Sequence, residues 1–425
     1  MSRITATYDI ETPAGLERAA AVLAGEQSTG TFVRLAAETD ALRARSAARI
    51  ESLSPTGSSA EPALPCRLSG AAYERARLTV SWPLASIGPS LPNLLSTVAG
   101  NLFELAEFSA LRLTDITLPA EFGAANPGPQ FGAPGTRALM GGHEGPLIGT
   151  IVKPSVGLSA QETAGLAGTL AAAGIDFIKD DELQANGPNC PLPERVAAVS
   201  RVLDAHAQRT GKRVLYAFNI TDEVEQMWRN LELLEAHGAL CAMVCVSSVG
   251  LTGLRALRDR APMLVHGHRA GWGLYSRSPH VGIDFGVWQK LWRLAGADHL
   301  HVNGLGSKFT EPDAVVARSA RSLQAPACDG AGPAHAAMPV FSSGQTVWQV
   351  DPSRRLLGSD DFIFCAGGGI MSHPGGPAAG VVALRQAAEA ARDGVPIGTR
   401  AAEAPELRDA LGAFRRPEMD LDGLF

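Results

Sequence analysis

The chain has 425 residues, which is enough for two domains. Hydrophobic residues make up 45% and charged residues 19%, a composition that argues against wholesale disorder. Lys and Arg number 37 against 43 Asp and Glu, and the resulting net charge of −6 argues against a protein that coats nucleic acid. Six cysteines without a CxxC pair, and no signal-like or membrane-spanning apolar stretch, predict a soluble cytoplasmic protein.

Lysine is rare in this chain. Of the 37 basic residues, 32 are arginine and five are lysine: Lys153, Lys179, Lys212, Lys290 and Lys308. A retained lysine indicates chemistry that a guanidinium cannot do, because only the amine gives up its proton near neutrality. A solvated surface charge is the alternative for each of them, and sequence context favours chemistry for Lys153, Lys179 and Lys308.

Residues 1–125 predict an N-terminal α+β domain of ferredoxin-like type. Strands are expected at 4–10, 73–83 and 110–118, and helices at 14–24 and 92–103. A Gly/Pro-rich run at 126–146 predicts the connection to the next domain, with a long ordered loop as the alternative.

From 147 to 425, short apolar runs alternate with longer helical patterns. Eight runs are expected to be strands, at 147–152, 175–178, 214–218, 239–246, 263–265, 299–302, 338–341 and 362–365. Ser159 and Glu162 form a capping box that begins the helix after the first run, and Gly174 ends it. The pattern predicts an α/β fold with a C-terminal (β/α)8 TIM barrel and a helical tail, and an open doubly wound sheet is the alternative.

Reactive side chains gather at the C-terminal ends of these strands, where a TIM barrel carries its active site. Lys153 follows the first strand, and Lys179 to Glu182 end the second. The run 179–182 is either a charged loop or a metal site. Asp181 and Glu182 offer the oxygen ligands that Mg²⁺ prefers, and Lys179 could join them only as the carbamate formed with CO₂.

Strand geometry adds a constraint to the metal hypothesis. Alternate residues leaving a strand point to one side, so Lys179 and Asp181 are expected together and Asp180 is expected to face away. A His-Gly-His sequence at 266–268 raises zinc as an alternative, which ranks lower because carboxylates and lysine suit a hard metal better.

Two anion sites are also expected at this end of the barrel. The run Gly367-Gly368-Gly369 could cradle a phosphate with backbone N–H groups, although glycine runs are common in simple turns. Arg269 and His301 are candidate cations for a second anionic group.

Motifs along nearly the whole chain resemble those of the large chain of ribulose-bisphosphate carboxylase (RuBisCO). In the order and spacing of that family they are Glu26-Gln27-Ser28-Thr29-Gly30-Thr31-Phe32, Gly100-Asn101, Lys153-Pro154, Gly157-Leu158-Ser159, the run 176–182, His268-Arg269, Asp298-His299-Leu300-His301, Lys308, Ser342, Gly344 and Gly367-Gly368-Gly369.

The resemblance implies roles for these residues. The catalytic set is Lys153, Lys179, His268 and Lys308. The metal set is Lys179, carbamylated by CO₂, with Asp181 and Glu182 around Mg²⁺. Lys153 would be the acid/base near an enediolate, and Lys308, on a mobile loop, would hold the CO₂-derived carboxylate.

The resemblance also implies substrate-binding residues and a homodimer with shared active sites. One phosphate would be bound by Thr31, Gly367 and Gly368, and the other anionic end by Arg269, His301, Ser342 and Gly344. In this family Glu26, Thr31 and Asn101 reach the active site of the partner subunit.

Departures from the family pattern indicate a RuBisCO-like protein of form IV rather than a carboxylase. Ser155 stands in place of a second lysine, Ile151 replaces Thr, Trp272 replaces His and Ser343 replaces Gly. Losing the second lysine removes a like charge near Lys153 and favours an acid role for it. Methionine-salvage enolases of this group carry Lys at the position of Asn101, which counts against that branch.

The leading hypothesis is Mg²⁺-dependent decarboxylation of a phosphorylated branched β-keto sugar acid of the 3-oxo-isoapionate 4-phosphate type, through an enediolate. The alternatives are an enolase or isomerase of a phosphorylated (thio)ketose, and a transcarboxylase or hydrolase acting on the same β-keto acid. A non-catalytic scaffold or regulator is the alternative outside enzymology.

Overall fold

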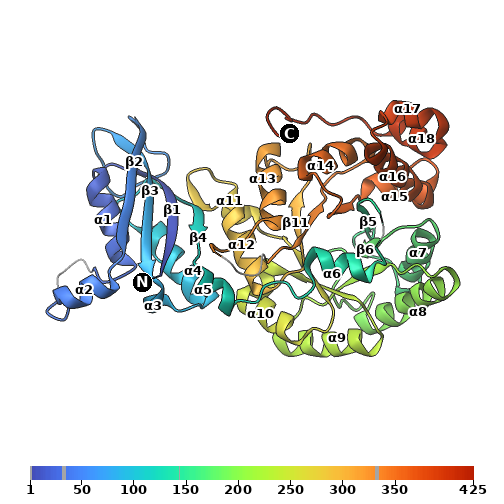
Figure 1. Cartoon of the computed structure of the whole chain (residues 1–425), viewed down its shortest axis with the longest axis horizontal. Helices are drawn as coiled ribbons and strands as arrows, with labels where there is room; N and C mark the ends of the chain where they lie inside the picture. Colours follow the sequence, from blue (N-terminus) through green and yellow to red (C-terminus); the bar gives the residue numbers. More distant parts are fainter. Residues whose placement is uncertain (1, 31–34, 143, 331–334) are drawn as a thin grey trace. The chain divides into compact units, whose positions relative to one another are not determined.

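The computed structural model describes residues 2–30, 35–142, 144–330 and 335–425. Contacts between residues divide the chain into two compact units (Figure 1). The N-terminal unit comprises Met1–Gly128, Gly271–Ala295 and Pro326–Ala334, and the barrel unit comprises Pro129–Ala270, Gly296–Ala325 and His335–Phe425. The division therefore differs from the single predicted connection at 126–146, because two later segments belong with the N-terminal unit.

The N-terminal unit is built on a mixed sheet with the strand order β10-β4-β1-β3-β2. The strands are β1 (Arg3–Thr12), β2 (Arg49–Ser59), β3 (Tyr73–Pro83), β4 (Ala110–Thr117) and β10 (Val281–Ile283). Neighbours are antiparallel except for β10 and β4. Strand β1 alternates buried with partly exposed residues, and its buried Tyr8 hydroxyl donates to the Val98 carbonyl at 2.7 Å.

The expected strands and helices of this unit are confirmed. Its helices are α1 (Leu16–Glu26), α2 (Asp40–Ser46), α3 (Leu84–Ile87), α4 (Leu91–Ala99), η1 (Leu102–Glu104), α5 (Ala120–Ala125), α11 (Gly273–Ser276) and α12 (Phe285–Ala295). Two strands were not predicted. Strand β2 is exposed along almost its whole length, and β10 has only three residues, so neither carries a burial pattern that a sequence could display.

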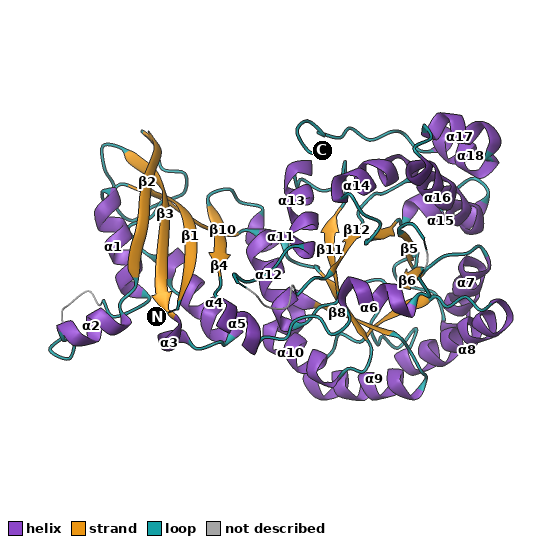
Figure 2. Ribbon diagram, in the orientation of Figure 1, coloured by secondary structure: helices purple, strands orange, loops and turns teal. Residues whose placement is uncertain are grey.

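The barrel unit is a closed ring of eight parallel strands, which confirms the predicted TIM barrel. The strands are β5 (Leu147–Ile151), β6 (Phe177–Lys179), β7 (Leu215–Asn219), β8 (Cys241–Cys245), β9 (Leu264–His268), β11 (His299–Asn303), β12 (Met338–Phe341) and β13 (Ile363–Cys365). Figure 2 shows these strands inside a ring of helices.

The helices of this unit are α6 (Gly132–Leu139), α7 (Ala160–Ala172), α8 (Leu192–Thr210), α9 (Val224–Ala236), α10 (Val246–Arg260), α13 (Asp313–Gln324), η2 (Val347–Gln349), α14 (Val350–Leu357), α15 (Gly368–Met371), α16 (Gly376–Asp393), α17 (Ile397–Glu403) and α18 (Pro405–Ala413). Both predicted boundaries of α7 are confirmed. Ser159 and Glu162 form the capping box, and Gly174 follows the helix at φ +88°.

Helix α6 shows that part of the Gly/Pro-rich segment belongs to the barrel core. The N–H groups of Phe131 and Gly132 donate to Asp298 Oδ1 at 2.7 and 2.8 Å. Gly132 has φ +55°, and a Cβ there would lie 2.4 Å from the Ala336 carbonyl oxygen, so a glycine is required. Ala133 then packs in the same buried cluster as strand residues such as Phe177.

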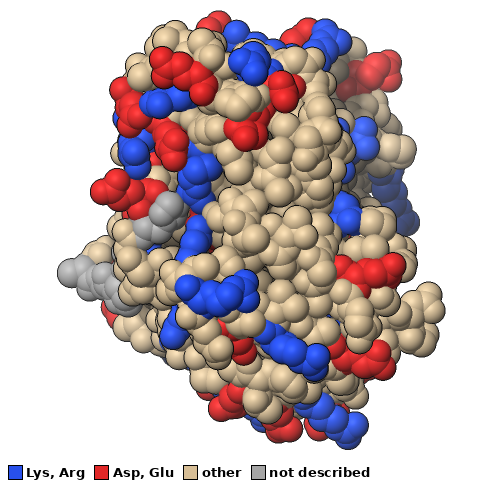
Figure 3. Space-filling view, turned by 90° about the vertical axis from the view of Figure 1, so that its right-hand side faces the viewer, with Lys and Arg blue, Asp and Glu red and all other residues tan. Residues whose placement is uncertain are grey.

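Charge on the surface is mixed. Figure 3 shows one face of the molecule, where acidic and basic side chains are interspersed. Among the described residues, no helix is both long and apolar enough to cross a membrane.

Candidate active site at the mouth of the barrel

The predicted reactive residues of the barrel unit lie at one rim, because the eight strands are parallel and end on the same side. Lys179 is the last residue of β6, and His268 is the last residue of β9. Lys153 comes two residues after β5, Ser342 directly after β12, and Gly367 two residues after β13. The barrel topology thus brings together residues that are more than 200 positions apart in the chain.

The predicted metal residues lie at and directly after the end of β6. The Lys179 side chain is fully buried, and its Nζ lies 3.7 Å from Glu182 Oε2. It donates a hydrogen bond to the Asp180 carbonyl oxygen at 2.7 Å. Asp181 is 1% exposed, and its Oδ1 accepts a hydrogen bond from the Leu183 N–H at 3.1 Å. The contacts at this place thus form two pairs, Lys179 with Glu182 and Asp181 with Lys153.

Asp180 faces away from this group, as the strand geometry predicts. Its carboxylate forms a buried ion pair with Arg195 at 3.1 Å and accepts hydrogen bonds from the Tyr216 hydroxyl at 2.6 Å and the Asn219 N–H at 2.9 Å. The Asn219 side chain in turn donates to the main-chain carbonyl of Asp181 at 3.2 Å. Sequence reasoning missed Asn219, although its place at the end of β7 is a usable signal.

Lys153 is bound to the metal group through Asp181. Its Nζ lies 2.6 Å from Asp181 Oδ2 and 2.7 Å from the Ser155 hydroxyl oxygen. Ser155, which stands where the family has a second lysine, therefore supplies a neutral hydrogen-bond acceptor instead of a like charge. The Lys153 side chain is 40% exposed, so it can exchange protons with solvent.

Three histidines form a buried chain inside the barrel. His266 Nε2 lies 2.8 Å from His301 Nε2, and His266 Nδ1 lies 3.4 Å from His299 Nδ1. Burial lowers the pKa of His301 and His266 well below the usual range, and it lowers the pKa of His299 to about 3. His301 is therefore neutral, not the cation that the sequence analysis predicts. Its Nδ1 lies 2.9 Å from the Ser342 hydroxyl.

His268 is placed between the histidine chain and the metal group. Its Nε2 lies 3.4 Å from Glu182 Oε2, and its ring centroid lies 4.6 Å from that of His301. Burial, together with the charge of Lys179, lowers the pKa of His268 well below its usual value. Its Nδ1 is buried and has no hydrogen-bond partner among the described residues. This nitrogen is available to a ligand.

Arg269, the predicted cation of a second anion subsite, lies directly after β9. It is 9% exposed and pairs with Glu311 at 3.3 Å. Burial lowers the pKa of Arg269 to about 10, and the carboxylate of Glu311 acts in the opposite direction. Glu311 was not predicted, because no motif marks it.

Lys308 lies on the segment between β11 and α13. Its N–H donates to the Ser343 carbonyl at 3.3 Å, and its exposed side chain reaches over the Phe309 ring, with Nζ 5.2 Å from the centroid. A Cβ added to Gly344, which has φ +84°, would lie 3.6 Å from Lys308 Cβ.

The predicted phosphate cradle has the room that a ligand needs. A Cβ at Gly369 would lie 2.4 Å from the Gln345 carbonyl oxygen, so packing explains that glycine. A Cβ at Gly368 would meet nothing within 4 Å, and one at Gly367 would make only an ordinary contact with Ile151. Glycine at 367 and 368 is therefore not required by the protein's own packing, and the open space suits a bound anion.

The remaining predicted residues lie in the N-terminal unit. Glu26 ends α1 and Asn101 precedes η1, and both are exposed. The Gln27 amide, in the orientation that satisfies its neighbours, donates to the Ser96 carbonyl at 3.2 Å and accepts from the Asn101 N–H at 2.9 Å. These two predicted segments are therefore adjacent. Thr31 lies outside the described residues.

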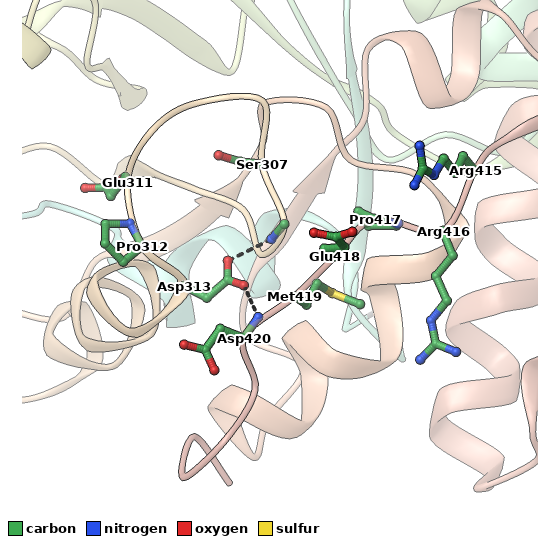
Figure 4. Close-up of a pocket in the computed structure, with 11 residues that line it drawn as sticks. Ser307, Glu311, Pro312, Asp313, Arg415, Arg416, Pro417, Glu418, Met419 and Asp420 are labelled. Atoms are coloured by element: carbon green, nitrogen blue, oxygen red, sulfur yellow. Dashed lines mark hydrogen bonds between the residues drawn. The ribbon is translucent and has the colours of Figure 1, made fainter.

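A cavity of about 840 Å³ opens beside the segment that carries Lys308. As Figure 4 shows, residues 306–313 form one side of this cavity and residues 415–420 form the other. Asp313 joins the two sides, since its carboxylate accepts from the N–H of Gly306 at 2.7 Å and from the N–H of Asp420 at 2.8 Å. The C-terminal tail is thus attached to this segment.

The donor set fits a hard metal only with an additional anionic oxygen. In the described part of the chain, no group of three or more His, Cys, Asp or Glu side chains could hold a metal ion. Asp181 and Glu182 provide two carboxylates, and the third side chain at this place is the amine of Lys179. A carbamate on Lys179 would convert this group into three oxygen donors of the kind that Mg²⁺ accepts.

Comparison with known proteins places the chain in a family. Residues 132–414 match the family "Ribulose bisphosphate carboxylase large chain, catalytic domain", and residues 2–122 match its N-terminal domain. The chain is similar to a 3-oxo-isoapionate-4-phosphate transcarboxylase/hydrolase from Xanthobacter autotrophicus, with 51% identity over 97% of this chain and 99% of the other. It is 42% identical to a 3-oxo-isoapionate-4-phosphate decarboxylase from Rhizobium etli, over 97% of this chain and 98% of the other.

A solved structure agrees with these matches. The crystal structure of a rubisco-like protein from Burkholderia fungorum superposes with a TM-score of 0.91 and 43% identity, covering 97% of this chain and 100% of the other. The departures from the carboxylase pattern lie around the site described above, at Ile151, Ser155 and Ser343. The chain therefore belongs to the RuBisCO large-chain family, as a RuBisCO-like protein.

Proposed function

We propose that this protein is an enzyme that acts on 3-oxo-isoapionate 4-phosphate and breaks a carbon–carbon bond of this β-keto acid. The observation that carries the proposal is the convergence of Lys153, Lys179, Asp181 and Glu182 at one rim, in a chain whose similar relatives bear the name of this substrate. These names favour bond cleavage over the enolase or isomerase alternative, and an enzyme over a scaffold.

The protein's own residues can carry the steps of such a reaction. Mg²⁺, held by carbamylated Lys179, Asp181 and Glu182, would supply Lewis-acid stabilisation of negative charge on the ketone and the adjacent hydroxyl. Lys308 would orient the carboxylate of the substrate. In decarboxylation the carboxyl group leaves as CO₂, and the electron pair of the broken carbon–carbon bond passes to the neighbouring carbon and the ketone, which gives an enediolate.

Lys153 would end the reaction by giving its proton to the enediolate carbon. Its contacts with Asp181 and Ser155 hold the ammonium group in place, and its 40% exposure allows the proton to be replaced from water. At the other end of the substrate, Gly367 and Gly368 would take the phosphate if the substrate binds in one direction, and Arg269 would take it in the other.

The fate of the carboxyl group separates two reactions. Decarboxylation is the leading hypothesis of the sequence analysis, and two relatives with that name are 42% and 41% identical. The transcarboxylase/hydrolase is 51% identical to this chain, which favours transfer or hydrolysis of the carboxyl-bearing fragment. We therefore rank transcarboxylation and hydrolysis first and decarboxylation second.

A product assay tests both. Enzyme that has been incubated with Mg²⁺ and bicarbonate is given 3-oxo-isoapionate 4-phosphate labelled with ¹³C in the carboxyl group, and the label is followed by NMR. Label in a new carboxylic acid supports transfer or hydrolysis, and label in CO₂ supports decarboxylation. Unchanged substrate refutes both, and solvent deuterium exchange without carbon loss would instead support the isomerase alternative.

The metal hypothesis predicts that Lys179→Ala and Lys179→Arg both lose activity by a factor of about 10³ or more, since neither can form the carbamate. Calorimetry with Mg²⁺ gives a second readout, because bicarbonate should strengthen Mg²⁺ binding in the wild type and have no effect in either variant. Lys212→Arg is the control. Full activity of a folded Lys179→Arg variant would contradict the hypothesis.

A homodimer with shared active sites follows from the family resemblance and remains a proposal. Asn101→Ala and Lys179→Ala should each be inactive alone, because each would damage a different half of one site. A mixed dimer of the two variants should regain about half of the activity, since one of its two sites is then intact, and a statistical equimolar mixture should regain about a quarter. Mixtures without any activity would contradict shared sites.

A further inference from the structure

Glu311 forms an ion pair with Arg269, whose guanidinium the proposed function assigns to an anionic end of the substrate. Its Oε2 lies 3.3 Å from Arg269 and accepts a hydrogen bond from Asn303 Nδ2 at 2.6 Å. Both members of the ion pair are nearly buried, with side-chain exposures of 9% for Arg269 and 12% for Glu311. A guanidinium in such a place needs an anionic partner, and Glu311 supplies one within the chain.

A short hydrogen-bond chain fixes the carboxylate in this position. The Ser343 hydroxyl donates to Asn303 Oδ1 at 3.1 Å, which turns the Nδ2 side of the amide toward Glu311. Asn303 and Ser343 both adopt left-handed backbone conformations, with φ +64° and +72°. Ser343 stands where the family pattern has glycine. The hydrogen-bond chain therefore begins at a side chain that the family pattern lacks.

Glu311 also belongs to the segment that carries Lys308, three residues earlier. This segment is attached at its far end through Asp313, which binds the N–H groups of Gly306 and Asp420 (Figure 4). At its near end the Lys308 N–H is bound to the Ser343 carbonyl. The pair between Glu311 and Arg269 is therefore a side-chain link between this segment and the residue that directly follows β9.

A phosphate that approaches Arg269 meets the carboxylate of Glu311. Two anions that share one guanidinium in a nearly buried place repel each other strongly. We propose that Glu311 is a resident competitor for Arg269, displaced when the phosphate or carboxylate end of the substrate binds. The role rests on the proposed function only in assigning an anion to Arg269.

The competition gives the subsite a preference for highly charged groups. A phosphate dianion carries more charge than the carboxylate that it replaces, whereas a single carboxylate gains little by the exchange. Glu311 is thus a specificity-determining residue that weakens binding of all anions and penalises monoanions most. Removing its charge should make the subsite bind tighter and discriminate less.

Calorimetric titration with inorganic phosphate tests this without any turnover. The holoenzyme, prepared with Mg²⁺ and bicarbonate, is compared with its Glu311→Gln variant, which keeps the size of the side chain and removes the charge. We expect the variant to bind phosphate about tenfold more tightly, and acetate with a larger relative gain. When Arg269→Gln is present in both the wild type and Glu311→Gln, the two proteins should no longer differ in phosphate affinity.

Glu418→Gln is the matched control, because Glu418 lines the same cavity and is exposed. It should leave phosphate affinity unchanged. Equal or weaker phosphate binding by Glu311→Gln would overturn the proposal, and so would a gain of the same size in Glu418→Gln. A gain in affinity cannot come from misfolding, and thermal unfolding checks that Glu311→Gln and Glu418→Gln are both folded. Failure of the substrate assay alone, with the phosphate result intact, would affect only the proposed function.

Discussion

The two sides of the barrel mouth hold their charges in different ways. On the side of β5 and β6 there are two ion pairs, Lys153 with Asp181 at 2.6 Å and Lys179 with Glu182 at 3.7 Å. On the side of β9, β11 and β12, burial keeps three histidines neutral, and the ion pair of Arg269 and Glu311 lies beside them. The charged side chains of the β5–β6 side thus lie where the proposed reaction would generate charge. The other side consists of neutral histidines and one ion pair, Arg269 with Glu311, whose carboxylate a substrate anion could replace.

The largest effect on activity is expected from a substitution on the β5–β6 side, where the charged side chains lie. Lys153→Met removes the ammonium proton and keeps a side chain of similar length. We expect kcat to fall about 10²–10⁴-fold, the usual contribution of a positioned acid, with a small change in KM. Steady-state kinetics on 3-oxo-isoapionate 4-phosphate measures both constants.

Ser155→Ala is the companion variant, since Ser155 contacts Lys153 at 2.7 Å without taking part in the chemistry. Its kcat should fall less than tenfold, in proportion to one lost hydrogen bond. A Lys153→Met variant with nearly normal kcat would mean that another group delivers the proton.

Neighbouring acids on this side should behave in opposite ways. Asp180→Asn leaves Arg195 as an uncompensated buried charge, so we expect the free energy of unfolding to fall by about 3–5 kcal/mol. Asp181→Asn should abolish Mg²⁺ binding and activity with a much smaller loss of stability. Urea denaturation and Mg²⁺ calorimetry on both variants separate the two roles. Similar stability losses in both would contradict the division of labour.

Regular periodicity explains why so much of the barrel could be predicted. All eight strands were expected from apolar runs, because a strand buried on both faces displays its burial in the sequence. The metal site stays a prediction, but its residues Lys179, Asp181 and Glu182 are local in sequence, and the structure places them at and directly after the end of β6. Alternation along a strand predicted that Asp180 faces away from these residues, and its contacts with Arg195 and Tyr216 confirm this.

The β9–β12 side could not be predicted to the same extent, because its contacts join distant segments. Nothing local marks Glu311 as the partner of Arg269, which lies 42 positions earlier. The neutral state of His301 depends on burial by several strands, so it was wrongly expected to be a cation. Strand β10 was missed because three residues cannot show a periodic pattern. This strand comes from a later segment of the chain but belongs to the N-terminal sheet, so one boundary in the sequence cannot separate the two units.

The neutral histidines predict a pH dependence of stability. Their pKa values are lowered on folding, so below about pH 6.5 the unfolded chain binds protons that the folded chain does not. The free energy of unfolding should therefore fall with decreasing pH, by about 1.4 kcal/mol per pH unit for each such histidine, until the folded pKa is reached. For His299 that window extends down to about pH 3.

Urea denaturation between pH 7.5 and 5.5 measures this slope. His299→Gln should reduce this slope by about 1.4 kcal/mol per pH unit, the contribution of one proton. Equal slopes in the wild type and His299→Gln would mean that His299 is protonated in the folded protein.

The smallest effect concerns Ser343, where the hydrogen bond and the backbone act in opposite directions. At φ +72° a serine is strained and a glycine is not, so Ser343→Gly loses the bond to Asn303 but relieves the backbone. Ser343→Ala loses the same bond and keeps the strain. We expect the glycine variant to be about 1 kcal/mol more stable than the alanine variant in urea denaturation. Both should bind phosphate a few-fold more tightly than the wild type, since Glu311 is held less firmly in each. If only one of them gains affinity, backbone strain and not the hydrogen bond to Asn303 controls the position of Glu311.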